Sequence, residues 1–340
     1  MIKIGIIGCG YWGPNIIRNF YETDGTEVAI CCDLNPDRLD FIEKRYPSIK
    51  ITEKYLDVLK DPRIDAVAIA TPVSTHFALA KEALSHNKHV FVEKPICSTS
   101  LQAASLIDFS NKKKKVLMVG HVFEYTAAVN KIKEIIESGE IGNVFYFNAW
   151  RVNLGIFQHD INVIWDLASH DISILYYILK EKPLSLNATG ISHVKSGMEN
   201  IAYITLHFKS NLIAHIHVNW LSPVKIRQIV IGGDKKMIIY DDIEPSEKVK
   251  IYDKGITIKN KNQEDTLKAE LQIEYRSGDV YLPKLEPTEA LRVECRHFLD
   301  CILNKRTPRS DGESGLRVVK TLEAAQRSLE NHGRKEKIDV

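Results

Sequence analysis

The stretch that decides the fold is Ile2-Lys3-Ile4-Gly5-Ile6-Ile7-Gly8-Cys9-Gly10-Tyr11-Trp12-Gly13-Pro14. A short apolar run leads into three spaced glycines, and a helical pattern opened by proline follows. In this context the first glycine permits a tight turn, the second admits a pyrophosphate to the backbone, and the third lets helix and strand pack closely. We therefore expect a buried strand and a phosphate-binding turn here, and no export signal.

Further along the chain, short apolar runs alternate with helical patterns as far as about residue 120. Strands are expected at 2–8, 28–33, 66–70, 90–93 and 116–120, and helices at 15–21, 38–45, 77–84 and 101–109. This alternation is typical of a doubly wound parallel sheet of the Rossmann type. We predict such an α/β domain over residues 1–122.

After that point the pattern changes to that of an α+β domain, which we place at residues 123–340. Helices are expected at about 129–137, 166–179, 289–303 and 315–329, and a strand at 144–150. Residues 212–220 alternate apolar and polar side chains, as in a strand with one face in the core. The second domain is therefore predicted to contain a largely antiparallel open sheet.

Composition restricts the class of protein. The chain has 340 residues, enough for two domains, with 44% hydrophobic and 26% charged residues. Lys plus Arg (46) nearly balances Asp plus Glu (44), so the net charge of +2 does not favour nucleic acid or a membrane surface. Six cysteines without a Cys-x-x-Cys pair indicate reduced thiols and a cytoplasmic location. A small-molecule substrate is expected.

Asp33 ends the second predicted strand, about 20 residues beyond the glycine loop, where an acid binds a ribose 2′-hydroxyl. An acid there repels a 2′-phosphate, which favours NAD over NADP. Arg38 lies close enough in sequence to leave NADP open as the second choice. Tyr11 and Trp12 belong to the same loop and are expected beside the cofactor.

Two further segments follow strands of the predicted sheet. Ala70-Thr71-Pro72, with His76 after it, ends one strand, and Glu93-Lys94-Pro95 ends another. Ligands of open α/β sheets bind outside the carboxyl ends of strands, so both segments should border the nicotinamide half of the cofactor. An ammonium there can stabilise an alkoxide or pass on its proton, which makes Lys94 the candidate for chemistry. The cofactor is expected to be lined by four residues of these segments: Thr71, Pro72, His76 and Glu93.

These motifs resemble those of the glucose-fructose oxidoreductase and inositol dehydrogenase family (Gfo/Idh/MocA). The resemblance rests on the glycine loop, Ala70-Thr71-Pro72 with His76, Glu93-Lys94-Pro95, Gly120-His121, Gly139-Glu140-Ile141-Gly142, Asp166-x-x-x-His170 and Asp311-Gly312-Glu313-Ser314-Gly315. It spans essentially the whole chain. Glu-Lys-Pro together with Asp-x-x-x-His is specific for the family, whereas the glycine loop alone is not.

The resemblance implies that Lys94 is the catalytic lysine, His170 the proton-transferring histidine and Asp166 the acid one turn earlier. On a helix, residues four apart share a face, so Asp166 and His170 could reach one ligand or each other. Asp171 points about 100° away and is left out of the catalytic set. For His121, the wall of the cleft and a catalytic role both stay open.

The activity expected from this resemblance is NAD-dependent oxidation of a secondary ring hydroxyl of a sugar. The Gly-Tyr-Trp-Gly loop resembles that of predicted dehydrogenases of bacterial surface-polysaccharide pathways, which implies the 3-position of a UDP-linked sugar. An inositol or free-sugar dehydrogenase is the first alternative. An NAD-retaining glycosidase and a non-catalytic NAD-binding sensor remain further alternatives. Arg151, Lys225 and Arg227 could reach a phosphate but are expected to be surface cations.

His207, His215 and His217 fall on two neighbouring candidate strands of the second domain. Nothing with ligand spacing completes a zinc site around them, so we predict no metal. The family resemblance instead implies subunit contact through this sheet, in a homodimer or homotetramer.

Overall fold

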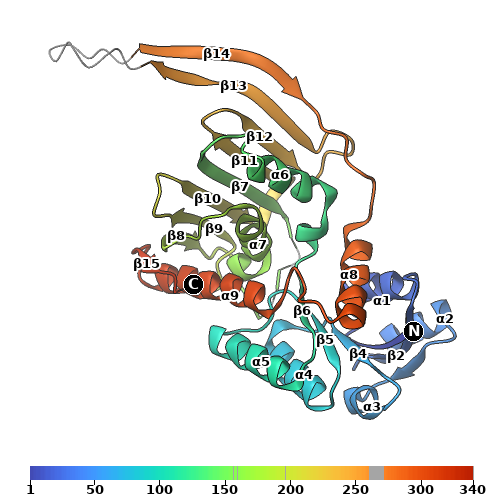
Figure 1. Cartoon of the computed structure of the whole chain (residues 1–340). Coiled ribbons are helices and arrows are strands. Elements are labelled where there is room, and N and C mark those ends of the chain that lie inside the picture. Colours follow the sequence, from blue (N-terminus) through green and yellow to red (C-terminus); the bar gives the residue numbers. More distant parts are fainter. Residues whose placement is uncertain (156, 159, 196, 260–271, 340) are drawn as a thin grey trace.

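A computed structural model describes residues 1–155, 157–158, 160–195, 197–259 and 272–339 of the chain (Figure 1). Its first part is a parallel sheet of six strands in the order β3-β2-β1-β4-β5-β6. The strands are β1 (Ile2–Ile7), β2 (Thr26–Cys32), β3 (Lys50–Thr52), β4 (Ala66–Ile69), β5 (His89–Glu93) and β6 (Leu117–Gly120). The predicted doubly wound parallel sheet is confirmed.

Helices cover this first sheet. They are α1 (Gly13–Tyr21), α2 (Pro36–Arg45), α3 (Tyr55–Lys60), α4 (Val73–Ser85) and α5 (Ser100–Lys113). Local chemistry fixes where two of them begin, since Asn35 accepts a hydrogen bond from the Asp37 N–H and Thr99 accepts one from the Gln102 N–H. Strand β3 and helix α3 were not predicted, because segments of three and six residues are too short to show a period.

The second sheet has nine strands in the order β14-β13-β12-β11-β7-β10-β9-β8-β15. They are β7 (Val144–Leu154), β8 (Ser185–Ile191), β9 (Ile201–His207), β10 (Ile213–Asn219), β11 (Leu221–Gly233), β12 (Met237–Asp241), β13 (Val249–Lys259), β14 (Gln272–Tyr281) and β15 (Glu336–Lys337). All its pairings are antiparallel except that of β7 with β10. The largely antiparallel sheet is therefore confirmed, and the hairpin of β13 and β14 extends beyond its body (Figure 1).

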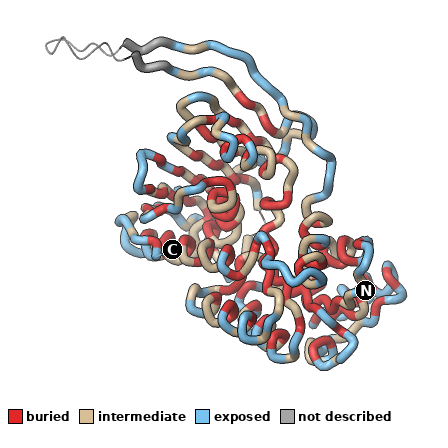
Figure 2. Tube along the Cα trace, in the orientation of Figure 1, coloured by how far each residue is buried: buried red, intermediate tan, exposed pale blue. Residues whose placement is uncertain are grey.

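One face of the second sheet is buried by the helices α6 (Ala127–Glu137), α7 (Ser169–Ile178) and α9 (Gly312–Glu330), as the red segments in Figure 2 show. The predicted alternation in β10 is confirmed, because Ala214, Ile216 and Val218 are fully buried. Helix α9 also packs on α5, and it contacts β6 of the first sheet and β8 of the second. Among the described residues, none of the helices is long and apolar enough to cross a membrane.

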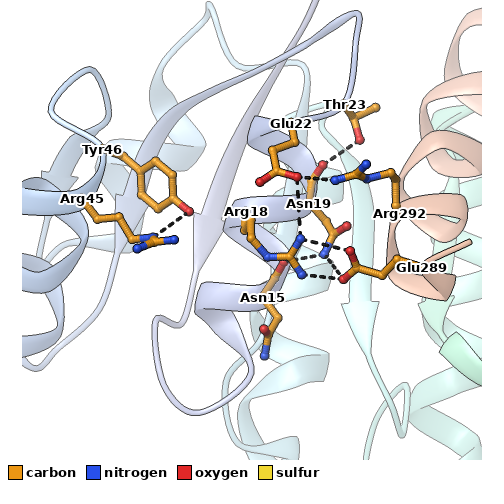
Figure 3. A network of polar contacts seen from close by, with 9 residues as sticks. All are labelled: Asn15, Arg18, Asn19, Glu22, Thr23, Arg45, Tyr46, Glu289 and Arg292. Atoms are coloured by element: carbon orange, nitrogen blue, oxygen red, sulfur yellow. Dashed lines mark hydrogen bonds and ion pairs between the residues drawn. The ribbon is translucent and has the colours of Figure 1, made fainter. Parts of the chain in front are cut away.

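Helix α8 (Ala290–Asn304) returns from the second sheet to pack on α1. Its Phe298 ring lies edge-on to Phe20 and Phe91, with centroids 6.1 and 5.8 Å away. Polar contacts also join α1 to the start of α8 (Figure 3): Glu289 accepts hydrogen bonds from Arg18 at 3.0 Å and from Asn19 at 3.0 Å. The first sheet is thus covered partly by a helix from the far end of the chain.

Candidate active site

The glycine loop has the geometry that a dinucleotide requires. Gly8 has φ of +100°, and a Cβ there would lie 2.4 Å from the Ala70 carbonyl oxygen. A Cβ on Gly13 would lie 2.3 Å from the Gly8 carbonyl oxygen, so strand and helix meet too closely for any side chain. At Gly10 a Cβ would meet only the Arg38 guanidinium, at 3.4 Å, which leaves the backbone open to a phosphate. These residues fit the pyrophosphate of NAD at the N-terminus of α1.

Asp33 lies directly beside this loop and is almost fully buried. Its carboxylate accepts hydrogen bonds from the Cys9 N–H at 2.6 Å and from the Asn35 N–H at 2.9 Å. The Arg38 guanidinium is 3.5 Å from the same carboxylate, with half of its side chain exposed. Asp33 therefore fixes the loop and also places a negative charge where the adenosine ribose would lie.

Lys94 and Asp166 join the two sheets at the site. The Lys94 Nζ donates to the Asp166 backbone oxygen at 2.8 Å and to its Oδ1 at 3.3 Å. The second carboxylate oxygen, Oδ2, accepts a hydrogen bond from the Trp220 indole N–H at 3.1 Å. Trp220 is fully buried, so the position of the carboxylate is set from the sheet side. This role of Trp220 could not be predicted from the sequence, because its partner lies 54 positions away.

His170 lies one turn beyond Asp166, but the helix there is not regular. Residues Ile164–Ala168 form a π-helical turn, and α7 begins at Ser169. The Nδ1 of His170 is buried and has no hydrogen-bond partner among the described residues. The helical spacing allowed a contact between Asp166 and His170. Among the described residues, the Asp166 carboxylate contacts Lys94 instead. His170 is instead held by the Phe123 ring, whose centroid is 5.0 Å away.

The charge state of His170 follows from its surroundings. Burial lowers its pKa well below the usual value of 6.5, and the positive charges of Lys94, Arg151 and Arg227 lower it further. The imidazole is therefore neutral at pH 7 and can accept a proton.

Asp171, next in the chain, forms a buried ion pair with Arg151. The guanidinium donates from Nε at 2.9 Å and from Nη2 at 2.8 Å, and both side chains are about 97% buried or more. Arg151 also lies over the Phe123 ring, 4.5 Å from its centroid. The expectation of a surface cation is thus wrong for Arg151, because a carboxylate one residue past His170 compensates its charge. Lys225 is exposed as expected, and the Arg227 side chain is one-third exposed.

Glu93 folds back over the end of β5. Its carboxylate accepts a hydrogen bond from the Lys94 backbone N–H at 3.2 Å and lies against Gly120, where a Cβ would come within 2.9 Å of it. Burial raises the pKa of Glu93 to about 7. His121 is buried next to Gly120, and its two ring nitrogens have no partner among the described residues. Burial lowers the pKa of His121 to about 3, so it is neutral as well.

His76 connects the two strand-end segments. One ring nitrogen lies 2.9 Å from the Pro95 carbonyl oxygen and the other 2.8 Å from the Thr71 carbonyl oxygen. The side chain is buried, so it fixes the segments after β4 and β5 relative to each other. Close to these segments, a pocket of about 270 Å³ is lined by Ser74 and Ser98 from the first domain and by Asn162 and Trp165 from the second.

The histidines of the second sheet lie away from this arrangement. His215 contacts Thr205 at 3.0 Å, His207 contacts Asn187 at 2.8 Å, and His217 stacks on Tyr203 with ring centroids 4.3 Å apart. Each imidazole is thus engaged by a neighbour on its own sheet face.

Models of known protein families match both parts of the chain. Residues 2–121 match the family model described as the oxidoreductase family with an NAD-binding Rossmann fold, and residues 129–239 match the Gfo/Idh/MocA C-terminal domain. The oxidoreductase YrbE of Bacillus subtilis is 25% identical over 96% of this chain and 94% of its own length. The scyllo-inositol 2-dehydrogenase (NAD(+)) of Bacillus subtilis is 24% identical over 90% of this chain and 88% of its own.

Among solved structures, the UDP-N-acetylglucosamine 3-dehydrogenase GnnA of Acidithiobacillus ferrooxidans superposes with a TM-score of 0.79. The two chains are 22% identical, and the match covers 98% of this chain and 99% of the other. The expected NAD cofactor and oxidoreductase activity on CH–OH groups are confirmed by the family match. The chain belongs to the Gfo/Idh/MocA family of NAD-dependent oxidoreductases.

Proposed function

We propose that this protein oxidises a secondary ring hydroxyl of a sugar, at the 3-position of a UDP-linked sugar, with NAD as the hydride acceptor. The observation that carries the proposal is the ammonium of Lys94, held 2.8 Å from the Asp166 carbonyl oxygen at the carboxyl end of β5. Ligands of such sheets bind at this edge, and a neutral histidine belongs to the same site.

The chain's own residues would hold the cofactor along the edge of the first sheet. The glycine loop and the start of α1 bind the pyrophosphate, and Asp33 binds the adenosine ribose. Thr71, Pro72 and Glu93 border the nicotinamide half, with Tyr11 and Trp12 beside it. When bound, NAD supplies the hydride acceptor, while the protein supplies orientation and electrostatics.

Two side chains act on the substrate hydroxyl. The neutral imidazole of His170 accepts the hydroxyl proton, and the Lys94 ammonium stabilises the negative charge that develops on the oxygen. Asp166 acts as a positioning residue, because its carbonyl and carboxylate oxygens fix the Lys94 Nζ while Trp220 fixes the carboxylate.

The substrate class rests on a sequence motif and on similarity, because the pocket of about 270 Å³ is lined by none of Lys94, Asp166 and His170. The nucleotide-sugar assignment follows the Tyr11-Trp12 loop and the similarity over the full length to GnnA, whose name gives UDP-N-acetylglucosamine as substrate. An inositol is the second candidate, because the relative at 24% identity that covers 90% of this chain is named scyllo-inositol 2-dehydrogenase.

The test is a substrate panel at an enzyme concentration close to that of NAD, followed by nicotinamide absorbance. The panel holds UDP-N-acetylglucosamine, its uronate, glucose, myo-inositol and scyllo-inositol. A high enzyme concentration allows the reduction to be detected even when the cofactor is reduced only once and stays bound. Reduction with a UDP-sugar but with neither inositol supports the proposal, and reduction with inositols alone would replace it by the second candidate. NAD binding without reduction by any compound would contradict both.

A further inference from the structure

A second arginine of the site is far less engaged than Arg151. On β11, Arg227 lies directly opposite Arg151 of β7 in the strand register. Along β11 it shares a face with Ile229 and Ile231, which are buried under the helices. The side chain of Arg227 therefore extends from the same sheet face as Arg151, whose partner Asp171 follows His170 in the chain.

The two guanidinium groups have different surroundings. Arg151 makes two short hydrogen bonds to Asp171 and is fully buried. Arg227 makes one long contact, from its Nη1 to Asp242 at 3.4 Å, and one-third of its side chain is exposed. Its Nε has no hydrogen-bond partner in the part of the chain that the structure describes. A guanidinium has five N–H donors in a planar fork suited to carboxylate and phosphate, and only one of them has a protein partner among the described residues.

The charge of Arg227 is compensated less completely than that of Arg151, because Asp242 makes a weaker contact with its arginine than Asp171 does. One oxygen of Asp242 accepts a hydrogen bond from the Tyr240 hydroxyl at 3.0 Å, and only the other lies near Arg227. The positive charge of Arg227 therefore acts on its surroundings and contributes to the low pKa of His170, after burial, Lys94 and Arg151. Because this field opposes proton uptake by His170, an anionic group on the ligand would favour the reaction.

We propose that Arg227 binds an oxyanion of the substrate, either a carboxylate on the sugar or a phosphate of its nucleotide link, and so selects anionic sugars over neutral polyols. The inference rests on the proposed function, since it concerns the ligand of the same site. It requires no new chemical step, only a charge-assisted hydrogen bond between guanidinium and oxyanion.

The experiment compares the wild-type protein with Arg227→Met, Arg227→Lys and Asp242→Asn, using UDP-N-acetylglucosamine, its uronate, free glucuronate and myo-inositol as substrates. Arg227→Met removes the charge but keeps the length of the side chain. The matched control is Lys225→Met, which removes an exposed cation from the same strand. Folding is checked by thermal melting, and NAD binding by calorimetry.

We expect Arg227→Met to raise KM for the anionic substrate by about 10-fold or more while kcat changes much less. Arg227→Lys should recover part of this loss, and Lys225→Met should have no effect. Asp242→Asn should lower KM for the anionic substrate, because it frees the guanidinium of Arg227. If the ion pair between Arg227 and Asp242 were merely structural, Asp242→Asn would raise KM. If Arg227→Met raises KM for the two uronates alone, Arg227 binds the carboxylate of the sugar. If it raises KM for both UDP-sugars, Arg227 binds a phosphate.

The inference is overturned if Arg227→Met leaves KM for every anionic substrate unchanged, or if the wild-type protein prefers myo-inositol. The first result leaves the proposed oxidation intact, because NAD reduction with a UDP-sugar is still seen. A preference for myo-inositol would in addition favour the second candidate function. The proposed function fails separately, when the wild-type protein binds NAD and reduces it with no member of the panel.

Discussion

The Nζ of Lys94 lies 2.8 Å from the backbone oxygen of Asp166, although the two residues belong to different domains and are 72 positions apart in sequence. Lys94 follows a strand of the parallel sheet, and Asp166 lies in a π-helical turn of the second domain. The ammonium is therefore positioned only when both domains are folded and packed.

Trp220→Phe should reduce kcat/KM by about 10-fold, because Asp166 loses the indole donor at 3.1 Å that fixes its carboxylate. Loss of part of a fully buried ring should also cost about 1–3 kcal/mol of stability. Trp150→Phe on β7 is the control, since Trp150 is only partly buried and makes no contact with Asp166 among the described hydrogen bonds. Equal activity losses in both variants would show that the indole hydrogen bond is irrelevant.

Asp33→Asn should shift cofactor preference toward NADP. The amide oxygen can still accept the Cys9 N–H and hold the glycine loop, while the Asn35 N–H loses its acceptor. The charge that repels a 2′-phosphate is gone and Arg38 is released. We expect the ratio of the Kd for NADP to the Kd for NAD to fall by about 10-fold. Calorimetry with Asp40→Asn as the exposed control checks this, and an unchanged ratio would exclude Asp33 from discrimination.

The acid limb of kcat/KM should lie well below pH 6.5. Neutral His170 is the active form, and burial together with Lys94 and Arg151 lowers its pKa, so the neutral form persists as the pH falls. The measurement is a pH profile from 4.5 to 8 in buffers of constant ionic strength. An acid limb at or above pH 6.5 would mean that His170 is solvated during turnover or that another group accepts the proton.

Glu294→Gln should stabilise the protein at pH 8 but not at pH 5. Glu294 is fully buried, and neither carboxyl oxygen has a partner among the described residues. Burial raises its pKa well above 4.5, and Glu93 and Glu124 raise it further. Above pH 4.5 the unfolded chain releases this proton and the native state holds it, so native stability falls as the pH rises.

A Gln side chain at position 294 does not ionise, so the variant does not lose native stability in this way as the pH rises. Thermal melting of both proteins at pH 5 and pH 8 measures the difference, with the exposed Glu286→Gln as the control. A Glu294→Gln variant that melts no higher than wild type at pH 8 would show that water or another group solvates the carboxylate.

Much of the fold could be predicted from the sequence because its signals are local. The glycine spacing after Ile7 and the strand-length apolar runs determine the first sheet, and alternation in β10 indicates a half-buried strand. Lys94 and His170 were predicted through their motifs, and the structure places both at the junction of the domains, where Lys94 lowers the pKa of His170.

What could not be predicted depends on packing between distant segments. The burial of Arg151 is set by Asp171, 20 residues away, and the Trp220 contact joins residues 54 positions apart. The π-helical turn at Asp166 is likewise invisible in the spacing of Asp166 and His170, because the same four-residue interval suits a regular helix. In each case the decisive partner lies on another element.

The most direct test of the central claim is a single-turnover measurement on Lys94→Ala with the substrate found in the panel. NAD binding is measured in parallel by calorimetry, so that loss of the cofactor is distinguished from loss of chemistry. We expect NAD affinity within about threefold of wild type and a rate of nicotinamide reduction lower by about 100- to 10,000-fold. A Lys94→Ala protein that reduces NAD at the wild-type rate, or one that simply fails to bind NAD, would contradict this expectation.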